Sequence, residues 1–204
     1  MEHRVGFLIN PIAGMGGRVG LKGTDQVADR ARALGARPSA QGKAAEMLGA
    51  LRENLERTDP APGIRWLTGS GAMGEDALLD AGFSNVDVVH RSGEETSNAD
   101  TRIVAQRCLE NGAGIIVFCG GDGTARDVSS VTGNATPILG IPAGVKMYSG
   151  VFAITPARAA EILLRHLEGE LDVAEADVLD LDEEAYRRGE WTVRLCDACL
   201  LYTT

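Results

Sequence analysis

The fold class of this 204-residue chain is decided by the stretch Gly114-Ile115-Ile116-Val117-Phe118-Cys119-Gly120-Gly121-Asp122-Gly123-Thr124. Its apolar first part predicts a strand at Gly114–Cys119 that is buried on both faces. Glycines and one acidic residue follow, which predicts a tight turn into a helix that starts near Thr124. A strand, a glycine-rich turn and a helix in this order indicate one unit of a parallel α/β sheet.

Other apolar runs predict further strands of the same kind, at Val5–Ile9, Ile64–Leu67, Val86–Val89 and Pro137–Ile141. Helix-like segments alternate with the strands, at Asp25–Leu34, Ala44–Leu55, Glu75–Asp80, Ala99–Asn111 and Ala157–Leu167. Strands that are nearly all apolar need cover on both faces. We therefore expect an α/β fold with a doubly wound, mostly parallel sheet.

The pattern of the sequence changes after Gly169. Val173–Asp182 alternates apolar and acidic residues and Trp191–Leu195 is a second strand candidate, so we expect an antiparallel hairpin joined by Glu183–Glu190. An isolated hairpin is only marginally stable in water. The tail therefore either packs on the first unit or begins a further domain. We divide the chain into an α/β domain at residues 1–170 and an incomplete β-rich second domain at residues 171–204.

The composition limits the function classes. Hydrophobic residues make up 44% and charged residues 24%, as in ordinary globular proteins. The longest apolar run is far below the ~20 residues of a membrane helix, and the start of the chain does not resemble a signal peptide. We expect a cytoplasmic protein without a membrane partner. The net charge of −9 argues against nucleic acid as a partner, so an anionic ligand would have to be held locally by backbone N–H groups, helix N-termini or a metal.

Four cysteines are present. Cys108 and Cys119 lie in apolar segments and are expected in the core. Cys196 and Cys199 have C-x-x-C spacing, but a zinc site would need two more ligands and the sequence offers no second pair. We therefore expect incidental thiols and assign no residues to a metal site.

The turn Gly120–Thr124 is the first candidate for chemistry. Its glycines allow close approach of the backbone to a ligand, and the N–H groups at a helix N-terminus can hold phosphate. Asp122 falls at the carboxyl end of a strand, where open α/β sheets bind ligands, and its carboxylate can accept a proton from a hydroxyl. The simpler alternative is a strand-to-helix turn in which Asp122 is the helix N-cap.

Two more strand ends carry glycine-rich loops. The first, Phe7–Gly17, has neither the Walker A nor the Rossmann spacing. The second, Ile138–Lys146, ends in a lysine that can balance phosphate charge. A plain turn and a solvated lysine are the alternatives. The candidate binding residues of the two loops are Asn10, Gly14, Gly16, Gly17, Gly140, Gly144 and Lys146.

Together the three loops resemble the ATP-NAD kinase family, within the NAD kinase and diacylglycerol kinase superfamily. Gly120–Thr124 matches the GGDGT signature of the superfamily. Leu8–Asp25 and Gly140–Tyr148 are most similar to the predicted ATP-NAD kinases, a group that includes the acetoin catabolism protein X type. The resemblance spans about residues 4–190.

The resemblance implies phosphorylation of the adenosine ribose 2′-hydroxyl of NAD to give NADP, with ATP or polyphosphate as donor and Mg²⁺ as the divalent metal. Asp122 would be the general base or would orient the hydroxyl. Gly120, Gly121, Gly123 and Thr124 would line the phosphates, and the Asn10 loop and Gly140–Lys146 would complete the cleft. Small-molecule nucleotides are the implied partners, and a homo-oligomer is expected.

The chain also departs from the family pattern. It has no Asn-Glu dipeptide of the kind that holds the acceptor nucleotide, and it stops at Thr204, soon after the second domain would begin. The chain thus resembles a truncated member of the family. Two alternatives stay open: a diacylglycerol or sphingoid-type lipid kinase with the same signature, and a non-catalytic nucleotide-binding remnant. The acidic charge and the lack of a basic amphipathic segment speak against the lipid kinase.

Three acidic or hydroxyl residues are weaker candidates. Asp100 and Thr101 lie in a region that is near the nucleotide in the related kinases, although capping of the following helix explains the acid equally well. Asp127 occupies the position at which lipid kinases of the superfamily carry a glutamate. Its simpler interpretation is a solvated helix face.

Overall fold

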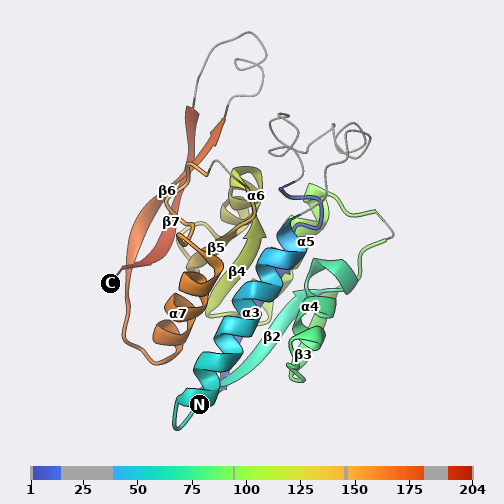
Figure 1. Ribbon diagram of the computed structural model, residues 1–204. Helices are drawn as coiled ribbons and strands as arrows, with labels where there is room; N and C mark the ends of the chain where they lie inside the picture. The colour runs from blue at the N-terminus through green and yellow to red at the C-terminus, as the bar shows by residue number, and fades with distance from the viewer. Residues whose placement is uncertain (1, 15–38, 94, 145–146, 182–192, 204) are drawn as a thin grey trace.

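The computed structural model describes residues 2–14, 39–93, 95–144, 147–181 and 193–203 (Figure 1). In chain order its elements are β1 (Glu2–Ile9), α3 (Ala40–Arg57), β2 (Gly63–Gly69), the 3₁₀ turn η1 (Gly71–Met73), α4 (Glu75–Asp80), β3 (Val86–His90), α5 (Asn98–Glu110), β4 (Ile115–Gly120), α6 (Asp122–Thr132), β5 (Ile138–Pro142), α7 (Pro156–Leu167), β6 (Asp172–Leu181) and β7 (Val193–Thr203). Each strand predicted for the sheet is present. The predicted helix Asp25–Leu34 lies outside the described residues.

The main sheet has five strands in the order β3-β2-β1-β4-β5, and every neighbouring pair is parallel. This confirms the predicted α/β fold with a parallel sheet. The direction of the strand order reverses between β1 and β4. From β1 the chain continues to β2 and β3 on one side, and from β4 it continues to β5 on the other. Open α/β sheets bind their ligands at such a switch point, beyond the carboxyl ends of the strands.

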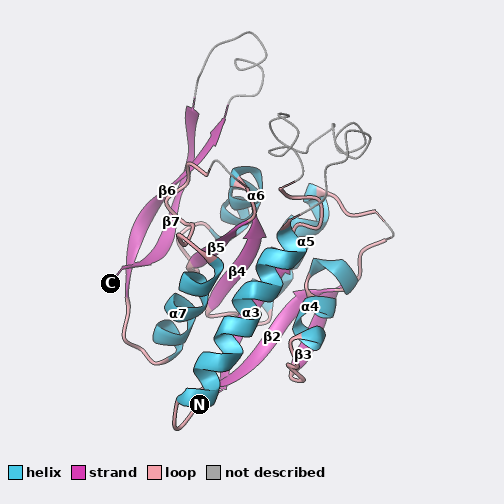
Figure 2. Ribbon diagram, viewed as in Figure 1, coloured by secondary structure: helices cyan, strands magenta, loops and turns pink. Residues whose placement is uncertain are grey.

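Helices cover both faces of the sheet, as Figure 2 shows. Successive strand residues point to opposite faces, so each strand contributes to both cores. On β4, Val117 and Cys119 pack toward α3, α4 and α7, whereas Ile116 and Phe118 pack toward α5 and α6. This alternation explains why the sheet strands are apolar almost without interruption.

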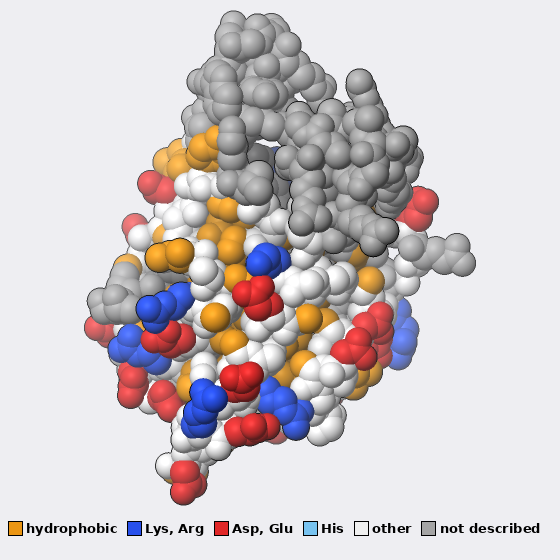
Figure 3. All heavy atoms as spheres, viewed as in Figure 1, with side chains coloured by type: hydrophobic (Ala, Val, Ile, Leu, Met, Phe, Trp, Pro, Cys, Tyr) orange, Lys and Arg blue, Asp and Glu red, His pale blue; other side chains and the backbone are white. Residues whose placement is uncertain are grey.

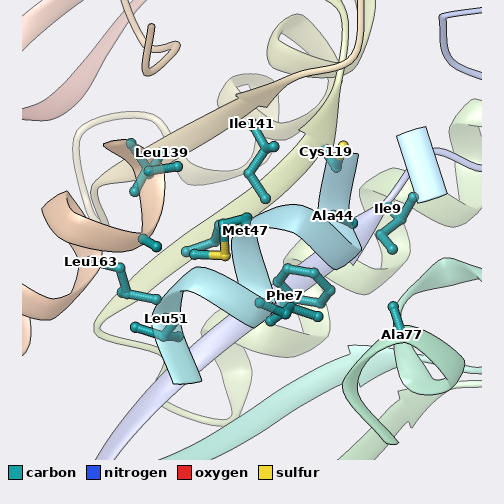
Figure 4. Close-up of a cluster of buried hydrophobic side chains, with 14 of the residues drawn as sticks. Phe7, Ile9, Ala44, Met47, Leu51, Ala77, Cys119, Leu139, Ile141 and Leu163 are labelled. Carbon is teal, nitrogen blue, oxygen red and sulfur yellow. The ribbon is translucent and has the colours of Figure 1, made fainter. Parts of the chain in front are cut away.

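The core under α3 and α7 is built from aliphatic side chains at helical spacing (Figure 4). Met47 and Leu51 of α3 lie beside Leu163 of α7, and all three are fully buried. Helix α7 begins where the sequence predicts, because Pro156 occupies the first turn and the Thr155 hydroxyl accepts a hydrogen bond from the Arg158 N–H at 3.2 Å. The outer surface of these helices mixes acidic and basic side chains (Figure 3).

The C-terminal strands β6 and β7 form an antiparallel pair that packs on the first unit. Val178 of β6 is fully buried against the side of the core formed by α6, and the Gly150 N–H donates to the Asp177 carbonyl at 2.9 Å. The hairpin therefore packs on the α/β unit, and the division into an α/β domain at residues 1–170 and an incomplete second domain at residues 171–204 stays a prediction. The second strand reaches Thr203 and is longer than the expected Trp191–Leu195, whereas the expected connection Glu183–Glu190 lies outside the described residues.

None of the helices in the described ranges is both long and apolar enough to cross a membrane.

Candidate functional site

The switch point of the sheet brings the three predicted loops together. At the end of β1, the Asn10 N–H donates to the carbonyl of Cys119 in β4 at 2.9 Å. At the end of β5, the Ala143 N–H donates to the carbonyl of Gly120 at 3.0 Å. The Ser39 hydroxyl in turn donates to the Ala143 carbonyl at 2.6 Å, which ties the start of α3 to the same place. Loops that are far apart in the sequence therefore share one edge of the sheet.

Asn10 connects the first loop to helix α6. Its side-chain amide donates to the Thr124 hydroxyl at 3.0 Å, and its amide oxygen accepts from the Ile12 N–H at 3.3 Å. Thr124 is 3% exposed, so this bond is largely shielded from water. Thr124 was predicted to line the phosphates, and Asn10 was predicted as a binding residue of the loop that completes the cleft. Their bond to each other shows that they also hold the first loop against the first turn of α6.

The GGDGT turn places the N-terminus of α6 at this edge. Gly121 is the N-cap and Asp122 is the first helical residue, with the Ala125 N–H donating to the Gly121 carbonyl at 3.0 Å. The interpretation of Asp122 as the N-cap is therefore wrong. The first N–H groups of a helix have no intrahelical acceptor and form the positive end of its dipole. The turn thus offers the kind of donor set that binds phosphate groups.

The glycines predicted as binding residues at this edge differ in the space around them. Among the described residues, a Cβ on Gly121 would meet no atom within 4 Å, and the nearest atom to one on Gly123 would be Arg126 Nη2 at 3.9 Å. A Cβ on Gly120 would lie 2.4 Å from Thr124 Oγ1, and one on Gly140 would lie 2.3 Å from Phe152 Cδ1. Open space beside the backbone therefore occurs at Gly121 and Gly123, next to the helix N-terminus.

The glycines of the outer loops are also crowded. Gly14 has a φ of +82°, and its added Cβ would lie 2.0 Å from Ser39 Oγ. An added Cβ on Gly144 would lie 3.2 Å from the Met147 sulfur. Gly16, Gly17 and Lys146 lie outside the described residues, so their roles stay predictions.

The Asp122 carboxylate is held by the loop that follows β5. Its Oδ1 atom accepts from the Ser149 hydroxyl at 2.6 Å, from the Ser149 N–H at 2.9 Å and from the Tyr148 N–H at 3.1 Å. Its Oδ2 atom accepts from the Tyr148 N–H at 3.0 Å, which is the only bond to this oxygen within the described part of the chain. The carboxylate is thus fixed through one oxygen and has acceptor capacity left on the other.

Ser149 and the Tyr148 N–H were missed as site groups in the sequence. Tyr148 ends the string Gly140–Tyr148 that resembles the family, but nothing in the string indicates a backbone donor. Ser149 is uncharged and its contact spans 27 positions in the chain. Local spacing carries no signal for such a contact.

The weaker candidate Asp100 is engaged by its own surroundings. It completes a capping box with Ser97, and its Oδ1 lies 2.9 Å from His90 Nε2. The hydrogen bond from His90 holds the pKa of Asp100 below its usual value, with Ser97 adding to the effect. Thr101 is 3% exposed. The capping interpretation therefore accounts for this segment.

Asp127 does not lie on a solvated face. It is 6% exposed, and its Oδ1 lies 2.8 Å from Arg102 Nη1 of α5 and 3.8 Å from Arg126 Nη2. A carboxylate can be buried when it is paired with a guanidinium. The expectation of a solvated side chain is therefore wrong, and Asp127 links α5 to α6.

Cys108 and Cys119 are core residues, as predicted. Burial raises the pKa of each thiol to about 12, so both are protonated at neutral pH. Within the described ranges, His, Cys, Asp and Glu side chains form no group of three or more that could hold a metal ion.

The fold and the site together define a doubly wound α/β domain with a glycine-rich helix N-terminus and a fixed carboxylate at its switch point. Nucleotide-binding domains are commonly of this class. The sequence model of the ATP-NAD kinase N-terminal domain matches residues 5–171. The chain belongs to that family, and hence to a family of kinases that bind small-molecule nucleotides.

Similarity to individual proteins is more distant. One similar solved structure is described as "a putative diacylglycerol kinase from Bacillus anthracis str. Sterne". It is 18% identical to this chain, with a TM-score of 0.38, and the alignment covers 88% of this chain and 45% of the other. The chain thus spans less than half the length of that structure. Among curated proteins, none matches this chain.

Proposed function

We propose that this protein transfers a phosphoryl group from ATP or polyphosphate to the adenosine ribose 2′-hydroxyl of NAD, which gives NADP. One observation carries the proposal. Asp122 has a carboxylate that is fixed through Oδ1 and has acceptor capacity on Oδ2, and it lies in the same turn as Gly121 and Gly123, whose backbones face open space. Membership of the ATP-NAD kinase family supports the choice of NAD as the acceptor.

The phosphate chain of a nucleotide would bind at the N-terminus of α6. The chain carries a net charge of −9, so long-range attraction does not draw an anion to it. Backbone N–H groups and the helix dipole can hold phosphate without a basic surface. The space beside Gly121 and Gly123 lets phosphate oxygens approach these N–H groups.

Asp122 would act on the acceptor hydroxyl. The ribose O–H bond breaks as its proton passes to Oδ2, and the ribose oxygen forms a bond to phosphorus while the bond from phosphorus to the donor's leaving oxygen breaks. General bases of this kind contribute about 10²- to 10⁴-fold to the rate. Most of the remaining catalysis in phosphoryl transfer comes from positioning and from neutralisation of charge.

A divalent metal is compatible with the residues at this edge. Mg²⁺ in phosphoryl-transfer sites is held by one or two carboxylates together with the phosphates of the substrate. Asp122 is the carboxylate in the turn at the N-terminus of α6. A Mg²⁺ ion that arrives with the nucleotide would neutralise charge on the transferring phosphoryl group.

The test is NADP formation from NAD with Mg²⁺ and either ATP or polyphosphate. We expect the wild-type protein to form NADP and Asp122→Asn to be about 10²- to 10⁴-fold slower. Asp80→Asn, at an exposed carboxylate at the end of α4, is the matched control and should keep the wild-type rate. Saturable binding of NAD or ATP without any NADP would overturn the proposal in favour of a binding protein. Phosphorylation of a diacylglycerol or a sphingoid base, but not of NAD, would overturn it in favour of a lipid kinase.

A further inference from the structure

Ser149 lies between the Asp122 carboxylate and the backbone of strand β6. Its hydroxyl oxygen is 2.6 Å from Asp122 Oδ1 and 2.9 Å from the Leu179 carbonyl oxygen, and it accepts from the Leu179 N–H at 3.0 Å. Ser149 is 6% exposed, so water competes little for these bonds. We propose that Ser149 is a positioning residue through which the C-terminal hairpin sets the carboxylate of Asp122. This inference rests on the function proposed above for Asp122.

The geometry gives the Ser149 hydroxyl one proton and two acceptors. While Asp122 is ionised, the proton points to the carboxylate, because hydrogen bonds to a charged acceptor are the stronger ones. When Asp122 has taken the proton of the substrate hydroxyl, Oδ1 becomes a weaker acceptor and the Ser149 proton turns to the Leu179 carbonyl. The Leu179 N–H donates to the hydroxyl oxygen in both states. Ser149 can thus stay hydrogen-bonded through the whole proton transfer.

A change of register in the hairpin occurs where Ser149 meets it. Val178 pairs with Asp197, but Leu179 pairs with Leu195, so the register shifts between Val178 and Leu179. Irregularities of this kind alter the local direction of a strand and often occur next to active sites. Here the residue after the shift is the one that directs both its N–H and its carbonyl at Ser149.

The residues of β6 that directly precede this contact are anchored as well. Val178 is fully buried in the core beside α6. The Asp177 carbonyl accepts from the Gly150 N–H at 2.9 Å. An added Cβ on Gly150 would lie 3.6 Å from the Ala176 Cβ, so the two backbones run close together. The hairpin therefore holds Ser149 in a defined place.

Ser149 also distinguishes the two oxygens of Asp122. With Ser149 present, Oδ1 accepts three hydrogen bonds and Oδ2 shares one of them. Without the hydroxyl, the N–H groups of residues 148 and 149 remain as partners, and the carboxylate has more freedom to rotate. A misplaced general base slows proton transfer without weakening the binding of the nucleotide.

The first experiment compares serine variants in the full chain. We expect Ser149→Ala to lower kcat for NADP formation about 10- to 100-fold with KM for NAD and for the donor within about twofold. Ser149→Thr keeps a hydroxyl and should recover most of the rate. The control is Ser129→Ala, which removes an equally buried hydroxyl that bonds within α6 to the Arg126 carbonyl. Equal effects of Ser149→Ala and Ser129→Ala, or a rise in KM at constant kcat, would overturn the positioning role.

The second experiment needs no turnover. In ¹H–¹⁵N NMR spectra, Asp122→Ala should shift the amide signals of Leu179 and Asp180, although Asp122 makes no hydrogen bond to β6 within the described residues. In a Ser149→Ala background, the same Asp122→Ala change should leave these two signals in place. Equal shifts in both backgrounds, or none in either, would overturn the coupling.

The two measurements separate the two proposals. If the wild-type protein forms no NADP but the signals of Leu179 and Asp180 respond through Ser149, the proposed activity fails and the link to the hairpin stands. If NADP forms but the signals do not respond, the link fails alone.

Discussion

Two groups of glycines lie at the switch point of the sheet, and they differ in what surrounds them. An added Cβ on Gly120 or Gly140 would lie within 2.4 Å of a side-chain atom of Thr124 or Phe152. An added Cβ on Gly121 or Gly123 would meet no atom of the described residues closer than 3.9 Å. The first two positions need glycine because the protein packs against them. The described part of the chain places no such demand on the second two, so they are the positions at which a ligand could approach the backbone.

The comparison shows that a glycine-rich motif combines two different requirements. Gly120 and Gly121 are adjacent in the signature, yet an added Cβ would clash with Thr124 at the first and would meet no described atom within 4 Å at the second. The packing requirement should appear as a loss of stability on substitution, and the ligand requirement as a loss of activity.

The largest expected effect is at Gly120. In Gly120→Ala the new methyl group would lie 2.5 Å from the Thr124 Cβ, a backbone-fixed atom that no change of rotamer can move away. We expect the free energy of unfolding to fall by about 3 kcal/mol. Urea denaturation measures it, with Gly121→Ala as the neighbouring control. If the two variants are similarly stable, close packing against Gly120 does not require glycine there.

The next effect is at Gly140. In Gly140→Ala the methyl group would meet the Phe152 ring, at 2.3 Å from Cδ1 and 2.6 Å from Cε1. We expect a loss of about 2 kcal/mol in the free energy of unfolding. Because the clash is with a side chain, Phe152→Leu should reduce the cost of Gly140→Ala, which a double-mutant cycle measures. Additive effects of the two changes would contradict this account of Gly140.

The pH of these measurements matters because of His166 on α7. Burial lowers the pKa of His166 to about 4, and the nearby His3 adds to the effect. In the unfolded chain His166 takes up a proton at about pH 6.5, whereas in the folded chain it does so only near pH 4. The stability that His166 contributes is therefore complete above about pH 6.5 and is lost as the pH falls toward 4.

We expect a loss on the order of 2 kcal/mol over that interval, because each unit of pKa difference corresponds to about 1.4 kcal/mol and His166 is only half-buried. His166→Gln should flatten this part of the stability profile, measured by urea denaturation between pH 4 and 8. A wild-type profile that is already flat there would contradict the prediction. The glycine variants are accordingly compared above pH 7.

Much of the fold could be predicted because its signals are local. The apolar runs and helical spacing that locate β4, α4 and α7 depend on a few consecutive residues, and the observed elements agree with the prediction within a few positions. The order of the strands and the docking of the hairpin on α6 depend on contacts between distant segments. Periodicity does not encode them, so the sequence left the place of the hairpin open.

The same division holds for the candidate site. Asp122 could be found because it stands in a recognisable turn after a buried strand. Ser149 could not, because its partner Leu179 lies in a hairpin that begins more than twenty positions later in the chain. Asp127 was misjudged for a related reason: its partner Arg102 lies on another helix. Sequence patterns therefore located the carboxylate but not the groups that hold it.

The smallest expected effect is also the most informative about the ligand. Gly123 lies in the first turn of α6, and in Gly123→Ala the new methyl group would come no closer than 3.9 Å to its nearest neighbour. Because alanine is the better helix former, we expect the free energy of unfolding to rise by about 0.5 kcal/mol. The methyl group would nevertheless occupy the space proposed for phosphate, so NADP formation should fall, chiefly through a higher KM for the donor. Urea denaturation and initial rates on one preparation measure both quantities. If activity falls while stability rises, loss of folding cannot explain the fall. If the variant is more stable and its kinetics are unchanged, the phosphates bind elsewhere.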